Sequence, residues 1–411
     1  MTPTSSTPST SSRACSPPVT RPWRCSWTTC APIPVPIRHA SSSTDRRALP
    51  NGVKVSDAMP DIQADDAFGT MLALTDTVAP WAVRVAATLR LADLVAPGGA
   101  PADAILKGLE AAGERVDHEA VRRLLRYLAS LGVFEYDAAS ELYRPTRLSE
   151  LMTGDSPVSM RDWWRMDSAM CRLDQTPTLM MEAIRTGEPV YERIFGRDVW
   201  ADLAQHPPLA ASFEQAMAHK TRISLDSVIA AVDWRARGDV VDVGGGHGLL
   251  LQAILKISPQ ARGTVFDTPA GVATARAHLA GSPVAGRIAF AEGDFFGRWP
   301  AGADTYVLMN VLHNWPDDQV VRLLRRGAEA LGPTGRLLVV ETVVGGAGDQ
   351  RSLARLDMMM LLFCGGKERS RPQYDELAAR AGLTITGSHP TSFGLAILEL
   401  APAGTTPAGS A

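Results

Sequence analysis

The stretch VVDVGGGHG, residues 240–248, decides the fold that we predict for this chain. An apolar run ends there in a loop with glycines at positions 244, 246 and 248, and the helical run LLLQAILKI follows. Glycine permits a tight turn and a close approach of the backbone to a ligand. A dinucleotide-binding loop has the spacing G-x-G-x-x-G, but Leu249 stands where its third glycine belongs. The loop therefore points away from a pyrophosphate binder, and we expect His247 to be a spacer.

The residues after this loop alternate between short apolar runs and helical runs. Five runs have the length and composition of strands: DVVDVG, ARGTVFD, RIAFAEGD, TYVLMNV and RLLVVET. Helical runs such as DDQVVRLLRRGAEAL separate most of them, and LTITGSHPTSFGLAILEL has the pattern of two strands joined by a turn. Alternation of strand and helix predicts a parallel sheet. We therefore predict an α/β domain over residues 237–400, with a doubly wound, mostly parallel sheet of seven strands.

Two acidic residues follow predicted strands. Asp267 ends the second strand, where a carboxylate can accept hydrogen bonds from both ribose hydroxyls of a nucleoside. Asp294 follows the third strand, where it can accept from an adenine amine while Phe295 packs on the ring. Each aspartate could instead be a helix N-cap or a turn residue. Because the glycine loop and both acids belong to one edge of the sheet, together they favour an adenosine site without a phosphate.

Composition excludes several classes of protein. The chain has 411 residues, 45% of them hydrophobic, and a formal net charge of −3. No apolar run approaches the roughly 20 residues that span a bilayer, so we expect neither a membrane nor a nucleic-acid partner. The five cysteines include no C-x-x-C pair, which predicts reduced thiols in a cytoplasmic protein without disulfides or zinc. No cluster of carboxylates with histidine predicts another metal.

The two ends of the chain have a different composition. Residues 1–60 are rich in Ser, Thr and Pro, so we predict a disordered tail, and we predict another over residues 401–411. The arginines and serines of the first tail are also typical of an organelle transit peptide. We favour a different interpretation, in which translation begins near Val53 or Met59 and the native protein lacks the tail.

Residues 61–150 predict a mainly helical domain. One periodic run, over residues 67–95, is interrupted by Pro80, and a second carries leucines at positions 124, 125, 128 and 131 before Gly132. The strand-like pieces VFEY and ELYRPT follow, with DAAS between them. Helices followed by a small hairpin are typical of a winged helix.

A winged helix has two possible functions here. Arg122, Arg123 and Arg126 could face the phosphates of DNA, or they could form the solvated face of a dimerisation domain. The net charge of −3 and the absence of another basic cluster favour the dimerisation domain.

The motifs VVDVGGGHG, FDTP, EGDFF, LHNWPDD, LLVVE and GGKERS occur in an order that resembles one family. It is that of the class I S-adenosylmethionine-dependent O-methyltransferases, of the plant caffeate/flavonoid type and its bacterial small-molecule relatives. The resemblance covers about residues 62–400. It implies a Rossmann-like methyltransferase fold, a homodimer held by the N-terminal domain, and methyl transfer to a phenolic or similar hydroxyl. Cofactor contacts would fall on Gly244, Gly246, Asp267, Asp294 and Phe295. Asn310 stands where plant members usually carry lysine, and its amide can still form a hydrogen bond there.

His313 is the residue to which we assign general-base catalysis. A phenol titrates near ~10 and a histidine near ~6.5, so neutral imidazole is available at pH 7. An imidazole base needs an acid that orients it, and Glu341 and Glu368 occupy the positions that flank the base in the family. Glu368 could otherwise be a surface acid paired with Lys367 or Arg369.

The segment LHNWPDD departs from the family at one position. The family commonly has His-Asp-Trp, whereas this chain has Asn314, which keeps a hydrogen-bonding side chain without the charge. We expect transfer to survive because both glutamates remain. Asp317 and Asp318 are interpreted as the cap and first turn of the next helix.

Residues 151–236 predict a helical connector rich in tryptophan and methionine. We assign Trp164 and Met170 from this connector, together with Met359 and Phe363, to the pocket of a small aromatic acceptor. Ordinary core packing explains the same four side chains equally well. Two alternatives to methyl transfer stay open: a decarboxylase or hydroxylase with the same fold and cofactor, and a winged-helix regulator that binds DNA.

Overall fold

The computed structural model describes residues 67–95, 98–154, 156, 159–346 and 348–404. From Gly69 onward the chain forms one compact unit. Both predicted tails lie outside the described residues, apart from residues 401–404, and so do the two proposed translation starts at Val53 and Met59.

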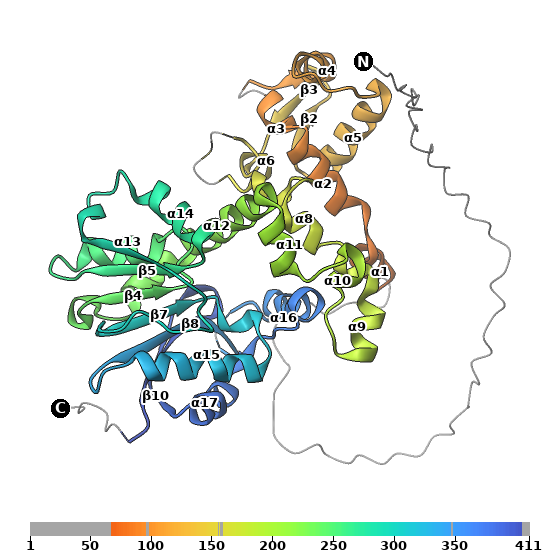
Figure 1. Cartoon of the computed structure of the whole chain (residues 1–411). Coiled ribbons are helices and arrows are strands. Elements are labelled where there is room, and N and C mark those ends of the chain that lie inside the picture. The colour runs from red at the N-terminus through yellow and green to blue at the C-terminus, as the bar shows by residue number, and fades with distance from the viewer. Residues whose placement is uncertain (1–66, 96–97, 155, 157–158, 347, 405–411) are drawn as a thin grey trace, which may run out of the picture. The chain divides into compact units, whose positions relative to one another are not determined.

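The N-terminal region is mainly helical and contains a small sheet (Figure 1). Its helices are α1 (Ala67–Thr75), α2 (Val78–Thr88), α3 (Leu91–Leu94), α4 (Ala102–Ala111), α5 (His118–Ser130) and α6 (Arg147–Glu150). The first helical run breaks at Asp76 and Thr77, not at Pro80 as predicted. Asp76 Oδ1 accepts the backbone N–H of Val78 at 2.7 Å, and Pro80 fits within the first turn of α2, where its missing N–H is not needed.

The predicted hairpin is confirmed as part of a three-stranded antiparallel sheet. Its strands are β1 (Ala100–Pro101), β2 (Phe134–Asp137) and β3 (Leu142–Pro145), in the order β1-β3-β2. Helix α5 begins at the N-cap Asp117 and buries Val121, Leu125 and Leu128. Leu131 is exposed instead of buried, because it caps the helix where the chain turns into Gly132.

The arginines of α5 form ion pairs with neighbouring acids. Arg122 pairs with Asp103 of α4, and Arg126 pairs with Glu119 at 3.4 Å. These pairs neutralise two of the three charges that a phosphate-binding face would need, and the structure therefore favours the solvated-face interpretation.

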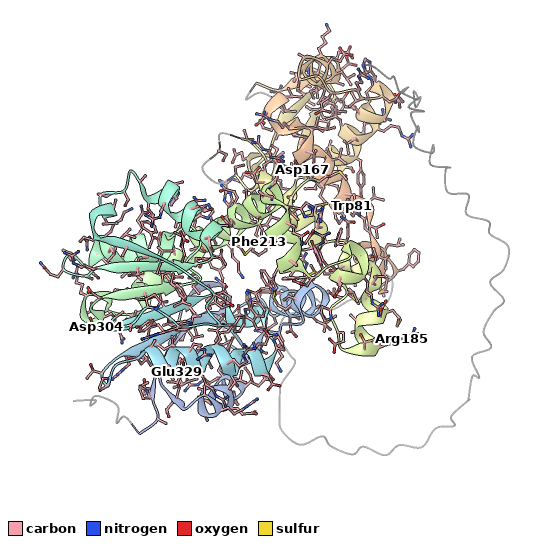
Figure 2. All side chains as sticks on the ribbon, viewed as in Figure 1. Trp81, Asp167, Arg185, Phe213, Asp304 and Glu329 are labelled. Atoms are coloured by element: carbon pink, nitrogen blue, oxygen red, sulfur yellow. The ribbon has the colours of Figure 1, made fainter. Side chains whose placement is uncertain are left out.

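The connector is helical, as predicted. It contains α7 (Arg161–Trp164), α8 (Ala169–Leu173), η1 (Thr176–Leu179), α9 (Met180–Thr186), α10 (Tyr191–Phe195), α11 (Val199–Gln205), α12 (Pro207–Ala231) and η2 (Trp234–Arg237). The longest of them, α12, carries Phe213, which Figure 2 labels. Helix α12 contacts α7 and α8 of the connector as well as α13 and β11 of the following domain. Helix α12 therefore packs against both the connector and the C-terminal domain.

The C-terminal domain contains the predicted sheet. Along its path of seven strands the order is β10-β11-β8-β7-β4-β5-β6, and the short β9 pairs with β8 outside this path. The parallel strands are β4 (Val240–Val243), β5 (Gly263–Asp267), β6 (Ile288–Glu292), β7 (Thr305–Met309) and β8 (Arg336–Val344), with β9 (Arg369–Ser370). The antiparallel strands β10 (Leu383–Pro390) and β11 (Leu395–Pro402) complete it. The prediction of a mostly parallel, doubly wound sheet is confirmed.

Helices cover both faces of this sheet (Figure 1). Helices α13 (Leu249–Ile257) and α14 (Pro269–Leu279) lie on one face; α15 (Asp317–Ala330) and α17 (Arg371–Arg380) lie on the other; α16 (Gln350–Cys364) follows β8. Alternate side chains of β7 point to opposite faces: Tyr306 and Leu308 pack in the cluster with α15 and α17, and Val307 packs with α13 and α14. Burial on both faces explains why the strands are continuous apolar runs.

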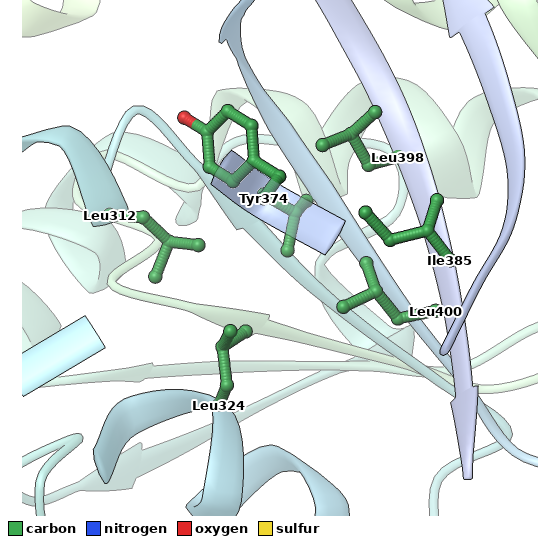
Figure 3. Close-up of a pocket in the computed structure, with 7 residues that line it drawn as sticks. Leu312, Leu324, Tyr374, Ile385, Leu398 and Leu400 are labelled. Carbon is green, nitrogen blue, oxygen red and sulfur yellow. The ribbon is translucent and has the colours of Figure 1, made fainter. Parts of the chain in front are cut away.

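The void drawn in Figure 3 lies inside this core. Its lining is apolar except for the hydroxyl of Tyr374, and consists of Leu312, Leu324, Val339, Tyr374, Ile385, Leu398 and Leu400. The void is too small to hold a water molecule. It belongs to the packing between α17 and the sheet and does not provide a ligand site.

Candidate active site

The glycine loop lies at the point where the strand order reverses. Strand β4 has β5 on one side and β7 on the other, and open α/β sheets bind ligands in the crevice at such a point. All three predicted glycines have positive φ: 70° at Gly244, 51° at Gly246 and 71° at Gly248. A Cβ on Gly248 would lie 2.6 Å from Leu279 Cδ1, so the start of α13 requires glycine there. The prediction of a tight glycine turn is confirmed.

His247 lies within this turn. Its ring is 5.6 Å from that of His278, and burial is the main cause that lowers the pKa of His247 to about 4. The side chain is therefore neutral at pH 7, which agrees with a spacer but does not test that prediction.

The two predicted acids follow neighbouring strands. Asp267 ends β5 and its Oδ2 accepts the N–H of Gly246 at 2.9 Å, which joins the acid to the glycine loop. Asp294 follows β6, is exposed, and accepts the N–H of Phe296 at 2.8 Å. The loops approach each other, since Gly293 N–H donates to the carbonyl of Asp267 at 2.9 Å. The predicted grouping of these acids at one sheet edge is therefore present.

Asn310 lies across the crevice, immediately after β7. Its φ of 56° is unusual for a residue other than glycine. Its backbone N–H donates to Val340, but its side-chain Oδ1 is buried and accepts no hydrogen bond from the described residues. A buried amide oxygen without a partner is costly, so a ligand that donates a hydrogen bond would satisfy it.

His313 lies three residues further along and is buried, with 4% of its surface exposed. Its Nδ1 lies 2.7 Å from Glu368 Oε1 and 4.0 Å from Glu341 Oε2. Glu341 Oε1 accepts the N–H groups of Val311 and Leu312 at 2.8 and 2.6 Å. Burial is the main cause that raises the pKa of Glu341. The structure therefore brings together all three residues that the sequence assigned to the base.

The segment GGKERS holds this group in place. Lys367 N–H donates to the carbonyl of His313 at 3.0 Å, and a Cβ on Gly366 would lie 2.0 Å from that same oxygen. Glycine is thus required for the close approach. The alternative pairing of Glu368 with Lys367 or Arg369 is wrong, because both cations pair with Asp317 at 2.8 Å.

Arg369 is a buried clamp on the loop that carries His313. Its guanidinium donates to the carbonyls of Leu312 at 3.2 Å and Trp315 at 2.7 Å, in addition to Asp317. The interpretation of Asp317 as a helix cap is therefore corrected: Pro316 is the N-cap of α15, and Asp317 stands in its first turn. Asp318 also stands in the first turn and pairs with Arg380 at 2.7 Å.

An apolar cluster lies beside this group. Met170, Met359 and Phe363 belong to it, together with Trp200 and Phe213, and this packing is compatible both with a pocket lining and with ordinary core. Trp164 does not: it packs against the core of the N-terminal domain, and its neighbour Trp163 takes its place in the cluster. Adjacent helical residues point in different directions, so a pair of tryptophans gives no sequence signal for which one faces the connector.

Aromatic rings link this cluster to the glycine loop. Trp200 stacks on Trp315 with centroids 5.5 Å apart, and Trp315 meets Phe295 edge to face at 6.0 Å. A Cβ placed on Gly244 would lie 3.9 Å from the Phe295 ring. The glycine loop and the apolar cluster therefore adjoin each other at Trp315.

Comparisons with known proteins agree with this geometry. Residues 178–384 match the model of the O-methyltransferase domain, and residues 72–155 match that of the O-methyltransferase dimerisation domain. The chain is 41% identical, over 80% of its length and 96% of the relative's, to 2,7-dihydroxy-5-methyl-1-naphthoate 7-O-methyltransferase from Streptomyces carzinostaticus. The chain belongs to the S-adenosylmethionine-dependent O-methyltransferases.

Two further relatives of this methyltransferase are informative. An O-methyltransferase from neocarzinostatin biosynthesis, solved with S-adenosyl-L-homocysteine and 1,4-dihydroxy-2-naphthoic acid, matches with a TM-score of 0.73 and 39% identity. The match covers 80% of this chain and 98% of that one. Aclacinomycin 10-hydroxylase from Streptomyces purpurascens is 38% identical over 79% of this chain and 88% of its own.

Two charged residues of the methyltransferase were missed by sequence reasoning. Asp242 is buried in β4, its Oδ2 accepts no hydrogen bond from the described residues, and burial is the main cause that raises its pKa to about 7. Lys220 stands half-buried within α12. An acid inside an apolar strand was a signal that could have identified Asp242, whereas Lys220 gave none because helix faces commonly carry lysine.

Other predicted absences concern metals, disulfides and membranes. Within the described ranges, no group of three or more His, Cys, Asp or Glu side chains could hold a metal ion, and Cys171 and Cys364 are free thiols. No helix in the described part of the methyltransferase combines the length and apolar character needed to cross a bilayer.

Proposed function

We propose that this methyltransferase transfers the methyl group of S-adenosylmethionine to a phenolic hydroxyl of an aromatic secondary metabolite, with His313 as the general base. The observation that carries the proposal is the buried contact of 2.7 Å between His313 Nδ1 and Glu368 Oε1. A histidine oriented by a carboxylate at the carboxyl end of a strand is suited to proton abstraction. His313 is also next to the crevice in which the cofactor would lie.

Several residues fit the adenosine part of the cofactor. Asp267 would accept from the ribose hydroxyls, and Asp294 would accept from the adenine amine while Phe295 contacts the ring. Asn310 would use its unsatisfied Oδ1 to accept from the nucleoside. A Cβ on Gly246 would meet no atom within 4 Å, so Gly246 and Gly244 leave the loop open to close approach.

The proton transfer uses the second nitrogen of the imidazole. His313 Nδ1–H donates to Glu368, which leaves Nε2 with a free lone pair that accepts the proton of the acceptor hydroxyl. The negative charge of Glu368 then stabilises the imidazolium, and Glu341 holds the backbone of the same loop. S-adenosylmethionine, when bound, supplies an electrophilic methyl group, so a deprotonated oxygen in line with it is all that the protein has to provide.

The acceptor is an aromatic ring system. Met170, Met359 and Phe363 would contact it, because their cluster lies beside Trp315 and offers the polarizable surface that binds flat ligands. The naphthoate acceptors named for the relatives support this class. The same relatives support a role of this enzyme in antibiotic or related secondary metabolism.

Assembly and domain limits complete the proposal. The match to the dimerisation model supports a homodimer formed through the domain of residues 61–150. We place the connector at residues 151–236 and the cofactor domain at 237–400. The free thiols of Cys171 and Cys364 support a cytoplasmic enzyme.

An acceptor screen tests the proposal. Purified protein is incubated with S-adenosylmethionine that carries a labelled methyl group and with hydroxylated naphthoates, anthraquinones and phenazines, and each product is analysed by mass. The expected result is a mass gain of one methyl group on oxygen. A protein that binds the cofactor but never transfers its label to any of them would contradict methyl transfer.

A second candidate function rests on one specific relative. Because a hydroxylase is 38% identical to this chain, the same fold supports chemistry other than methylation. Products of the screen that gain oxygen without label, or lose carbon dioxide, would favour this alternative.

A further inference from the structure

Lys220 occupies an unusual position in the long helix α12. Residues four apart on a helix share a face, and the residues four before and four after Lys220 are Ala216 and Ser224. Both are buried, at 0% and 3% exposure. Lys220 is half-buried on this same face.

The face joins two packing clusters. Phe213 and Ala216 pack in the cluster beside Trp315, whereas Val228, two turns beyond Lys220, packs on the sheet. Phe213 is labelled on α12 in Figure 2. Lys220 therefore stands where the apolar cluster ends and the cofactor domain begins.

Two acids of the candidate active site act electrostatically on Lys220. Burial is the main cause that lowers the pKa of Lys220, and the negative charges of Glu368 and Glu341 act in the opposite direction. Neither acid is close enough to form an ion pair with it. Among the described residues, the Lys220 ammonium has no hydrogen bond or ion pair, and the second oxygens of both glutamates accept no hydrogen bond either.

We propose that Lys220 binds a carboxylate at the reaction centre, and that this carboxylate belongs to an aromatic hydroxy acid that serves as the methyl acceptor. The inference rests on the proposed function and names the substrate class more closely. A partly buried cation without a counterion is unfavourable, and a ligand carboxylate would supply the missing charge.

The surroundings select this kind of anion. The single positive charge of the Lys220 ammonium balances the single negative charge of a carboxylate. A doubly charged group such as a phosphate monoester would be repelled more strongly by Glu341 and Glu368. The apolar cluster leading to Lys220 favours an anion attached to an aromatic ring. The methionyl carboxylate of the cofactor is the other carboxylate that could reach the same ammonium, and the experiment separates the two sources.

The experiment compares two matched ligands on the enzyme loaded with S-adenosylhomocysteine. Calorimetry measures the dissociation constants of a dihydroxynaphthoic acid and of the dihydroxynaphthalene with the same hydroxyl pattern. We expect wild type to favour the acid, and Lys220→Met to reduce that preference by about 10- to 100-fold, the range of a hydrogen bond between charged groups. Lys220→Arg should restore most of it, and Lys256→Met, on the exposed side of α13, should not change it.

Titration of S-adenosylmethionine into the same variants identifies the source of the carboxylate. A weaker affinity of Lys220→Met for the cofactor, with the acid preference intact, would assign the ammonium to the methionyl carboxylate and overturn the acceptor proposal. An unchanged preference together with unchanged cofactor affinity would overturn any carboxylate site at Lys220. Wild type that binds neither the cofactor nor either ligand would instead contradict the proposed function. Wild type that binds the cofactor but shows no preference for the acid contradicts only this inference.

Thermal unfolding of each variant shows whether it is folded. If Lys220→Met does not fold, Lys220→Gln is used to repeat the test.

Discussion

Two pairs of acids at the same edge of the sheet have opposite environments. Asp267 and Asp294 are at least partly exposed. The backbone N–H of Gly246 in the glycine loop donates to Asp267, and that of Phe296, in the same loop as Asp294, donates to Asp294. Glu341 and Glu368 are buried, at 0% and 4% exposure, and are directed at His313 or at the loop that carries it.

We expect this difference in environment to separate cofactor binding from proton transfer. An exposed carboxylate remains charged and accessible, so it can accept hydrogen bonds from a polar ligand. A buried carboxylate interacts more strongly with a neighbouring imidazolium, because the low dielectric does not screen its charge. Substitutions in the first pair should therefore affect affinity for the cofactor, whereas those in the second should affect turnover.

The largest effect is expected at His313. His313→Ala should lower kcat by ~10²–10⁴-fold, the contribution of a positioned general base, while the dissociation constant of S-adenosylmethionine changes by less than about 3-fold. Steady-state assays with labelled cofactor and calorimetry measure the two quantities. His118→Ala, in the N-terminal domain, is the matched control. Turnover near that of wild type at neutral pH would contradict the assignment of the base.

Glu368→Gln should have the next largest effect. The amide keeps the shape but removes the charge that stabilises the imidazolium, so kcat should fall about 10- to 100-fold, corresponding to a charged hydrogen bond of ~1.5–3 kcal/mol. Affinity for the cofactor should stay close to that of wild type. Glu376→Gln, on the exposed side of α17, serves as the control. If Glu368→Gln weakened cofactor binding and left kcat intact, the distinction between the two pairs of acids would fail.

Asp267→Ala should show the reverse pattern. Loss of the ribose contact should raise the dissociation constant of S-adenosylmethionine about 10-fold or more, and kcat at saturating cofactor should change little, as expected for uniform binding. Asp294→Ala, at the more exposed position, should weaken the cofactor less. Equal affinities of wild type and Asp267→Ala would remove Asp267 from the cofactor site.

Asp242, a third buried acid, should affect the stability of the protein in a pH-dependent way. Its raised pKa, about 7, means that the folded protein holds a proton that the unfolded chain releases above the ordinary value of 3.8. The contribution of neutral Asp242 to the free energy of unfolding is therefore fully present below pH 3.8, and it is lost as the pH rises towards 7. Asp242→Asn does not titrate, so its melting temperature relative to wild type should increase by several degrees between pH 5 and pH 8.

The control for this prediction is Asp226→Asn, on an exposed position of α12. Melting curves of the protein without cofactor, recorded at matched ionic strength, measure the difference. A gap between Asp242→Asn and wild type that is constant across this pH range would mean that Asp242 titrates normally.

Sequence reasoning identified the local features of the site. The positive φ of Gly244, Gly246 and Gly248 follows from the absence of a side chain, and the buried strands follow from unbroken apolar runs. The order of these elements along the chain was enough to place Asp267 and Asp294 at one edge.

The limits of sequence reasoning are seen at α5, Trp164 and Asp317. Leu131 has the correct helical spacing but lies at the end of the helix, where the core no longer covers it. Trp164 packs against the core of the N-terminal domain and not in the cluster of Met170 and Phe363. Asp317 is paired with Lys367 and Arg369, which are far away in the sequence.

The sequence by itself determined the strand and helix order and the glycine turn, because these depend on residues within a few positions of one another. Only the tertiary structure decided which acids lie beside His313. His313 and Glu368 are 55 residues apart along the chain. Contacts between distant segments depend on how whole faces pack together, and the spacing of residues along the chain does not record that packing.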